Sequence, residues 1–101
     1  MWVFAMFDLP TDTKKARREY TFFRKNLLRS GFLQLQYSVY ARHCASDESA
    51  DVHARRVMAN LPPDGEVRVM RVTDKQFERM LIFHGKIRGQ TEKAPEQISF
   101  F

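Results

Sequence analysis

Residues 1–31 read MWVFAMFDLPTDTKKARREYTFFRKNLLRSG, in which an apolar segment is followed by an amphipathic one. The first eight residues predict a strand that is apolar on both faces, because successive side chains of a strand point to opposite sides. One face carries Trp2, Phe4 and Met6, and the other carries Val3, Ala5 and Phe7. Both sides of such a strand have to be covered.

The second half of this stretch predicts a helix from about Asp12 to Arg29. Pro10 ends the strand, Thr11-Asp12 supply capping groups, and Ser30-Gly31 ends the helix. Apolar residues recur at helical spacing in one stripe: Ala16, Tyr20, Phe23 and Leu27. The opposite side carries Lys14, Arg18, Lys25 and Arg29, flanked by Arg17 and Arg24. We therefore expect a helix that buries one side and exposes a basic ridge.

The net charge of the chain is concentrated in this helix. The formal net charge is +5, and residues 11–30 hold seven basic and two acidic residues. The remaining residues hold ten of each sign. A concentrated basic stretch in a folded domain indicates a polyanionic partner. The alternative is an ordinary solvated helix face.

Residues 32–72 predict strands on either side of a second helix. Residues 32–44 are rich in β-branched and aromatic side chains. They form either one long bent strand or two short strands with a tight turn near Tyr37-Ser38. The second helix opens at Ser46 and stops before Pro62-Pro63. Its expected buried stripe is Ala50, Ala54, Val57, Met58 and Leu61. Residues 66–72 predict another strand.

The end of the chain predicts two short elements and a tail. Thr73 and Gln76 have capping-box spacing, which predicts one helical turn. Residues 80–83 predict a strand, residues 85–96 are polar and predict a flexible segment, and residues 98–101 are again mostly apolar.

This element order predicts an α+β fold, a ferredoxin-like βαββαβ sandwich with an antiparallel sheet, two helices on one face and a C-terminal edge strand. We expect the domain to span residues 1–85, with a polar linker and apolar tail over 86–101. Two helices cover only one face of the sheet, so a second copy packing sheet to sheet is the simplest cover for the other face. The tail can add a strand to that partner, or contact its own chain.

Asp8 is the first candidate for chemistry. It ends the apolar strand on the face that carries Phe4 and Met6, and a buried carboxylate is costly unless it is paired, protonated or bound to a metal. A two-fold axis would bring two copies of Asp8 together around a divalent cation. The alternative, which spacing alone favours, is that Asp8 caps the first helix.

Other motifs for chemistry are lacking. Cys44 is the single cysteine, so no intramolecular disulfide forms and a reduced, cytoplasmic setting is expected. The apolar N-terminus has no basic region and is too short for a signal peptide or a membrane span, so no membrane partner is expected. His43, His53 and His84 have no metal-ligand spacing, and His43 is interpreted as a surface or turn residue. No phosphate-binding loop or nucleophile elbow is present.

Several sequence blocks point to a known family. Phe7-Asp8-Leu9-Pro10-Thr11 runs into Lys14-Lys15, and residues 23–28 are followed by Gly31-Phe32. Further blocks are Gln36-Tyr37-Ser38-Val39-Tyr40 with Arg42, Leu61-Pro62-Pro63 with Gly65, and residues 73–77. From about residue 2 to residue 85 the chain closely resembles the small CRISPR-associated spacer-acquisition proteins, CRISPR-associated endonuclease family two, in their type II-like variant.

This resemblance implies a ferredoxin-like homodimer that sits between dimers of the CRISPR integrase subunit and supports double-stranded DNA during spacer acquisition. It also implies a metal-dependent endonuclease activity on single-stranded RNA or double-stranded DNA. The family's metal-site aspartate corresponds to Asp8, which would take Mg²⁺ or Mn²⁺. The residues expected to contact nucleic acid are Lys14, Lys15, Arg17, Arg18, Arg24, Lys25 and Arg42.

Two other functions fit the same fold. One is a ribonuclease toxin of the virulence-associated D type, which resembles this family, and the other is a purely structural DNA-binding scaffold without catalysis. RNA cleavage without duplex binding favours the toxin, and DNA integration that survives loss of Asp8 favours the scaffold.

Overall fold

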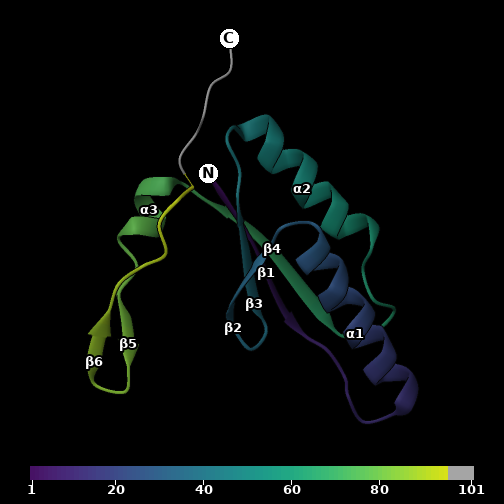
Figure 1. Cartoon of the computed structure of the whole chain (residues 1–101). Coiled ribbons are helices and arrows are strands. Elements are labelled where there is room, and N and C mark those ends of the chain that lie inside the picture. The colour runs from purple at the N-terminus through teal and green to yellow at the C-terminus, as the bar shows by residue number, and fades with distance from the viewer. Residues whose placement is uncertain (96–101) are drawn as a thin grey trace.

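Four antiparallel strands form the main sheet in the order β2-β3-β1-β4. A computed structural model describes residues 1–95, and Figure 1 shows the arrangement. The elements are β1 (Trp2–Asp8), α1 (Lys14–Arg29), β2 (Leu33–Gln36), β3 (Val39–His43), α2 (Asp47–Ala59), β4 (Glu66–Val72), α3 (Asp74–Glu78), β5 (Ile82–His84) and β6 (Ile87–Gly89). The first six follow the ferredoxin-like βαββαβ order, so the predicted fold class is confirmed.

Helices α1 and α2 cover one face of the sheet (Figure 1). The core beneath them is built from alternate residues of β1 and from the apolar stripes of both helices. Its members include Val3, Ala5, Phe7, Phe23, Leu27, Ala50, Ala54 and Val57. The predicted α2 stripe is wrong at two positions, since Met58 and Leu61 are 54% and 50% exposed. His53 is buried in the stripe instead.

The start of α1 excludes one role for Asp8. The helix begins at Lys14, and the hydroxyl of Thr13 accepts a hydrogen bond from the backbone N–H of Ala16 at 3.0 Å. Thr13 is therefore the N-cap. The alternative that Asp8 caps this helix is wrong, because a residue nearer the first turn supplies the hydroxyl.

Residues 32–44 form a hairpin rather than one bent strand. β2 and β3 pair on either side of a turn at Tyr37-Ser38, with a register shift between Gln34 and Gln36. The carbonyl of Ser38 accepts a hydrogen bond from the backbone N–H of Phe7 at 3.1 Å. This bond ties the turn to β1.

The second face of the sheet, which we call the open face, is partly covered by the chain itself. Trp2 stacks on Phe77 of α3, with ring centroids 3.9 Å apart and an interplanar angle of 7°. Both rings are 1% exposed. The predicted capping box of Thr73 and Gln76 is present and starts this short helix. At the Trp2 end, α3 of the same chain therefore supplies the cover that a second copy was expected to give.

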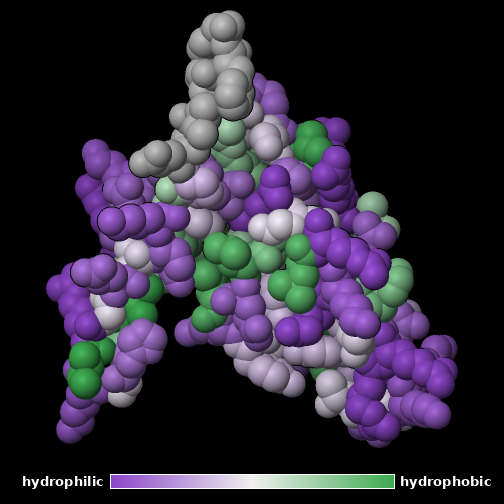
Figure 2. Space-filling model, in the orientation of Figure 1, coloured by the Kyte–Doolittle hydropathy of each residue, from purple (hydrophilic) through white to green (hydrophobic). Residues whose placement is uncertain are grey.

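The rest of the open face remains accessible. Cross-strand pairing places Met70 beside Phe4 and Leu33 beside Ala41, and these two apolar side chains are 45% and 51% exposed. Met6 and Leu35 are half-buried. Figure 2 shows hydrophobic side chains gathered in the middle of the side in view, and hydrophilic ones over the first turns of α1. An apolar area of this kind is left for a partner to cover.

The C-terminal part of the described chain differs from the prediction. β5 begins at Ile82, and residues 87–89, which were predicted within a flexible polar segment, pair with it as β6. Gly85 lies at the turn between them with a positive φ of 63°, a conformation that glycine adopts without strain. The apolar tail and the strand predicted for it lie outside the described residues. None of the three helices described is long and apolar enough to cross a lipid bilayer.

Candidate functional site

The outer side of α1 carries a row of accessible cations. The residues are Lys14, Lys15, Arg17, Arg18, Lys25 and Arg29, and all six are exposed. Five of them line one shallow groove, whereas Lys15 lies to one side, facing the loop before β4. Within residues 1–95, none of the six forms an ion pair with a carboxylate. By contrast, Arg55, Arg68 and Arg71 each pair with an acidic side chain. The positive charge of α1 is therefore free to meet phosphate.

Three of the residues predicted to contact nucleic acid bind the protein's own atoms. Arg17, which stays exposed, donates from Nη1 to the carbonyl of Thr11 at 3.1 Å. Arg24 donates from Nε to the Tyr40 hydroxyl at 2.9 Å and is half-buried. Arg42 donates to the carbonyl of Ser30, the C-cap of α1, at 2.6 Å. Its guanidinium fills the space where a side chain at Gly31 would lie. The side chains of Arg24 and Arg42 thus fasten α1 to β3, whereas the accessible cations lie on the exposed side of α1.

Asp8 is exposed at the end of β1. It lies opposite Glu66 of β4, and strand alternation places it on the open face with Met6. The register of β1 and β4 is therefore consistent with the prediction that Asp8 lies on the same face as Met6. Glu66 is already engaged, because Arg68 donates to its carboxylate at 2.7 Å. This hydrogen bond, together with the charge of Arg68, lowers the pKa of Glu66.

Gly65 fixes the backbone beside Asp8. Its φ is +91°, and a Cβ built there would lie 2.7 Å from the Asp8 carbonyl oxygen and 2.8 Å from Leu9 Cδ2. Only glycine permits this approach of the loop before β4 to the end of β1. The position of Asp8 therefore depends on a residue that is distant in sequence.

The metal expected at Asp8 does not fit one chain alone. Within residues 1–95, no three carboxylate, histidine or cysteine side chains gather closely enough to hold a metal ion. Glu66, which lies across the sheet from Asp8, is held by Arg68. Among residues 1–95, a single copy therefore gathers no ligand set around Asp8 that would hold Mg²⁺.

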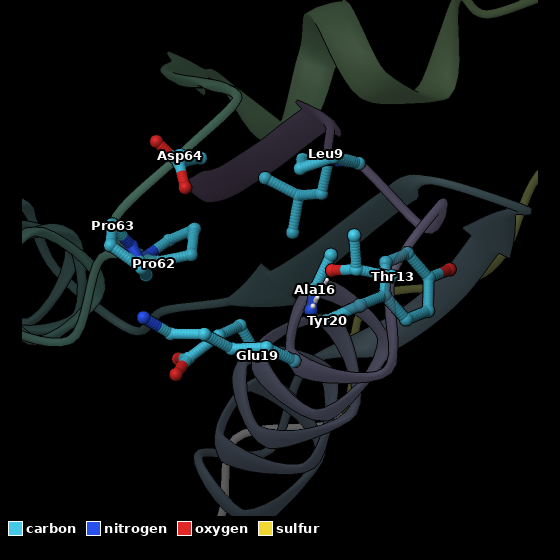
Figure 3. Close-up of a pocket in the computed structure, with 10 residues that line it drawn as sticks. Leu9, Thr13, Ala16, Glu19, Tyr20, Pro62, Pro63 and Asp64 are labelled. Carbon is cyan, nitrogen blue, oxygen red and sulfur yellow. Dashed lines mark hydrogen bonds between the residues drawn. The ribbon is translucent and has the colours of Figure 1, made fainter.

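A small pocket lies next to this strand end (Figure 3). Its volume is about 60 Å³, and it opens between the β1–α1 loop, the first turns of α1 and the loop before β4. Leu9, Ala16 and Pro62 point into it, and Glu19 and Asp64 lie at its rim. The lining carries no donor set for a metal and no nucleophile beside a base, so we assign it no chemistry.

His43 is part of a polar cluster and not a surface residue as predicted. It lies on β3 with its side chain 9% exposed, and its Nε2 is 3.2 Å from both carboxylate oxygens of Asp74. The amino group of Met1 also donates to Asp74. This hydrogen bond is the main reason that the pKa of Asp74 is lowered. Burial acts in the opposite direction and raises the pKa, whereas the hydrogen bond with His43 lowers it further. The cluster anchors α3 over Trp2, which explains the cover on the open face.

Asp74 and His43 are 31 residues apart, and no spacing rule connects them. Sequence reasoning missed this pair for that reason. The capping box that begins at Thr73 was the one available signal, since it fixed where α3 starts.

His53 is the second histidine with a structural role. It lies on α2 with 8% of its surface exposed, and among residues 1–95 its Nδ1 has no hydrogen-bond partner, as is also true of Arg42 Nε. Burial, followed by the charges of Arg42 and Arg56, lowers the pKa of His53. The folded state therefore favours the neutral imidazole.

We expect the stability of the protein to fall on mild acidification because of His53. The unfolded chain has the ordinary histidine pKa of about 6.5. At pH values between about 6.5 and the lower pKa of His53 in the folded protein, the unfolded chain binds more protons than the folded one. Acidification in this range therefore lowers the free energy of unfolding by at most about 1.4 kcal/mol per pH unit. Urea unfolding at pH 7.5 and 5.5, at one protein concentration, measures this loss. In His53→Leu the loss should be smaller than in the unchanged protein, and an equal loss would contradict the assignment.

Comparison with known proteins places the chain in a family. The sequence model of the family described as CRISPR associated protein Cas2 matches residues 1–80. The chain belongs to the Cas2 family. The matched segment includes the main sheet, α1, α2, Asp8 and the whole basic row of α1.

Individual Cas2 relatives match along most of the chain. A protein of Parvibaculum lavamentivorans is 55% identical over 101 residues, which cover 100% of both chains. One of Flavobacterium psychrophilum is 46% identical over 100% of this chain and 88% of its own. One of Streptococcus mutans is 38% identical over 85% of this chain and 79% of its own. Each is named CRISPR-associated endoribonuclease Cas2, so the chain belongs to a family of CRISPR-associated nucleases.

Proposed function

We propose that this Cas2-family protein works as a homodimer that binds nucleic acid along α1 and bridges CRISPR integrase subunits during spacer acquisition. The observation that carries the proposal is the row of six exposed cations on α1 without carboxylate partners among residues 1–95. Such a row suits the phosphates of double-stranded DNA, which it would contact without reading sequence.

Dimerisation through the open face supports this arrangement. The apolar side chains left on that face, including Met70 and Leu33, would be buried by a second copy. Asp8 lies on the same face, so a two-fold axis would bring two carboxylates together. Bound there, Mg²⁺ or Mn²⁺ would neutralise charge that develops on a scissile phosphate.

The nuclease substrate that we propose is single-stranded RNA, with DNA as the bound duplex. The names of the relatives support the RNA assignment, because they call those proteins endoribonucleases. In this scheme Asp8 is the site residue, and the cations of α1 hold the backbone of the nucleic acid in place.

A purely structural scaffold is the second candidate function. One observation favours it: a single chain gathers no three-ligand cluster among its described residues. The virulence-associated toxin has no comparable support, since each of the three relatives named above is CRISPR-associated by name.

The oligomeric state and partner binding test this proposal. Light scattering should give twice the 12.0 kDa chain mass, and the protein should co-elute with the integrase subunit on duplex DNA. Met70→Glu places a charge on the open face and should yield monomers. Val52→Glu is the matched control, because Val52 is 46% exposed on α2, compared with 45% for Met70, and this variant should stay dimeric. A monomeric unchanged protein, or two variants with equal masses, would contradict the proposed interface.

A further inference from the structure

Phe22 is an exposed aromatic residue in the middle of the basic row. It is 59% exposed on α1. Arg18 precedes it by four residues and Lys25 follows it by three, so helical geometry places all three on one side of the helix. Together with Lys14, Arg17, Thr21 and Arg29, these residues line a shallow groove.

The ring of Phe22 has no aromatic partner within residues 1–95. Every ring–ring contact in this part of the chain involves other side chains, such as Phe23 against Phe7 and Tyr20 against Tyr37. Phe23, the next residue, is 1% exposed in the core. Phe22 therefore leaves an accessible, flat apolar surface in a strongly cationic setting.

The chemistry of this setting fits an unpaired nucleobase. Cations alone are sufficient to bind the phosphates of a duplex, whose bases stack on one another and leave a face free only at the two ends. A base in a single strand has a free face that stacks on an aromatic ring. Arg18 and Lys25 lie about 6 Å before and about 4.5 Å after Phe22 along the helix axis, where each can meet a phosphate flanking that base.

We propose that Phe22 is a stacking platform for an unpaired base of single-stranded nucleic acid, with Arg18 and Lys25 holding the adjoining phosphates. This inference rests on the proposed function, since it assumes that α1 binds nucleic acid. It adds that the single-stranded parts of a substrate, such as a frayed end or an RNA strand, bind at the centre of α1. Charge complementarity favours a polyanion over an apolar protein partner at this place.

Binding of labelled oligonucleotides tests the platform. The probes are a single strand that carries 2-aminopurine, whose fluorescence changes on stacking, and a blunt duplex of the same length. Phe22→Leu should weaken single-strand binding by at least about fivefold and reduce the fluorescence change, because base–aromatic stacking is lost. Duplex affinity should change by less than about twofold, since phosphate contacts dominate it.

Two further variants separate stacking from folding. Phe83→Leu is the matched control, because Phe83 is 56% exposed on β5, away from α1, and its loss should leave both affinities unchanged. Phe22→Trp keeps an aromatic ring and should retain single-strand binding. Circular dichroism melting of each variant establishes that the fold is intact, and the result for Phe22→Trp also stands if Phe22→Leu proves unstable.

Three outcomes would overturn the inference. In the first, Phe22→Leu changes neither affinity, or changes both equally, while the unchanged protein still binds duplex; the proposed function then stands without the platform. In the second, Phe22→Leu weakens capture of the integrase subunit alone, which would make Phe22 a protein contact. In the third, the unchanged protein binds neither probe, and the proposed function fails together with the inference.

Discussion

Replacing Asp8 with asparagine is expected to reduce divalent-cation-dependent cleavage of single-stranded RNA by about 100-fold or more. The amide keeps the volume of the side chain and loses the negative charge that, in the proposed dimer, two copies of Asp8 would present to a cation. Because Asp8 is exposed at the end of β1, the free energy of unfolding should change by no more than about 0.5 kcal/mol. Single-turnover cleavage of a labelled RNA, with and without Mg²⁺ or Mn²⁺, measures the effect.

Asp12→Asn is the matched control for Asp8, since Asp12 is an exposed aspartate in the loop that follows β1. It should cleave at the unchanged rate, and chelation by EDTA should stop both Asp12→Asn and the original protein. Cleavage that persists in Asp8→Asn, or in EDTA, would show that the reaction does not depend on this carboxylate. If integration with the partner subunit survives in Asp8→Asn while no cleavage is seen in any variant, the scaffold function is favoured.

The affinity for duplex DNA is expected to fall by roughly 10³–10⁵ between 50 and 200 mM salt, if six to ten phosphates are contacted across the dimer. Under the proposed function, the six exposed cations on α1 would supply these contacts. Arg18→Gln and Lys25→Gln should each reduce the slope of log affinity against log salt, by about 0.9 for every phosphate contact removed. Fluorescence anisotropy titrations at four or more salt concentrations give the slopes.

Arg55→Gln provides the comparison for these variants. Arg55 is 73% exposed on α2, away from the cations of α1, and forms an ion pair at 2.7 Å with Asp51, which also pairs with Arg71. The salt slope should be unchanged in this variant. A slope near zero for the original protein, or equal slopes for Arg18→Gln and Arg55→Gln, would rule out α1 as the phosphate-binding surface.

The pH dependence of stability separates two of the titrating groups. Protonation of His53 should reduce stability just below neutral pH. The stabilisation that comes from the lowered pKa of Asp74 persists to a lower pH and is lost as that carboxylate becomes protonated. Experiments on DNA binding are therefore best made above pH 7, where both contributions are complete.

Local features of the sequence were sufficient for much of this fold. The apolar alternation of β1, the stripe of α1, the Ser46 cap of α2 and the Thr73 capping box all depend on residues a few positions apart. Helical periodicity likewise predicted that the basic residues of α1 are exposed. Strand alternation predicted the face of the sheet on which Asp8 lies. The motifs from Phe7 to Phe77 were also sufficient to indicate the family, which the comparison confirmed.

Only the tertiary structure decided which polar groups lie inside. Arg24 and Arg42 look like any other cations in the sequence, yet they bind Tyr40 and the end of α1. His43 meets Asp74 across 31 residues, and Phe77 covers Trp2 across the open face. Periodicity specifies which side of an element is buried, because it reflects the geometry of one helix or strand. The partner on that side depends on how distant elements pack, and no local pattern records that.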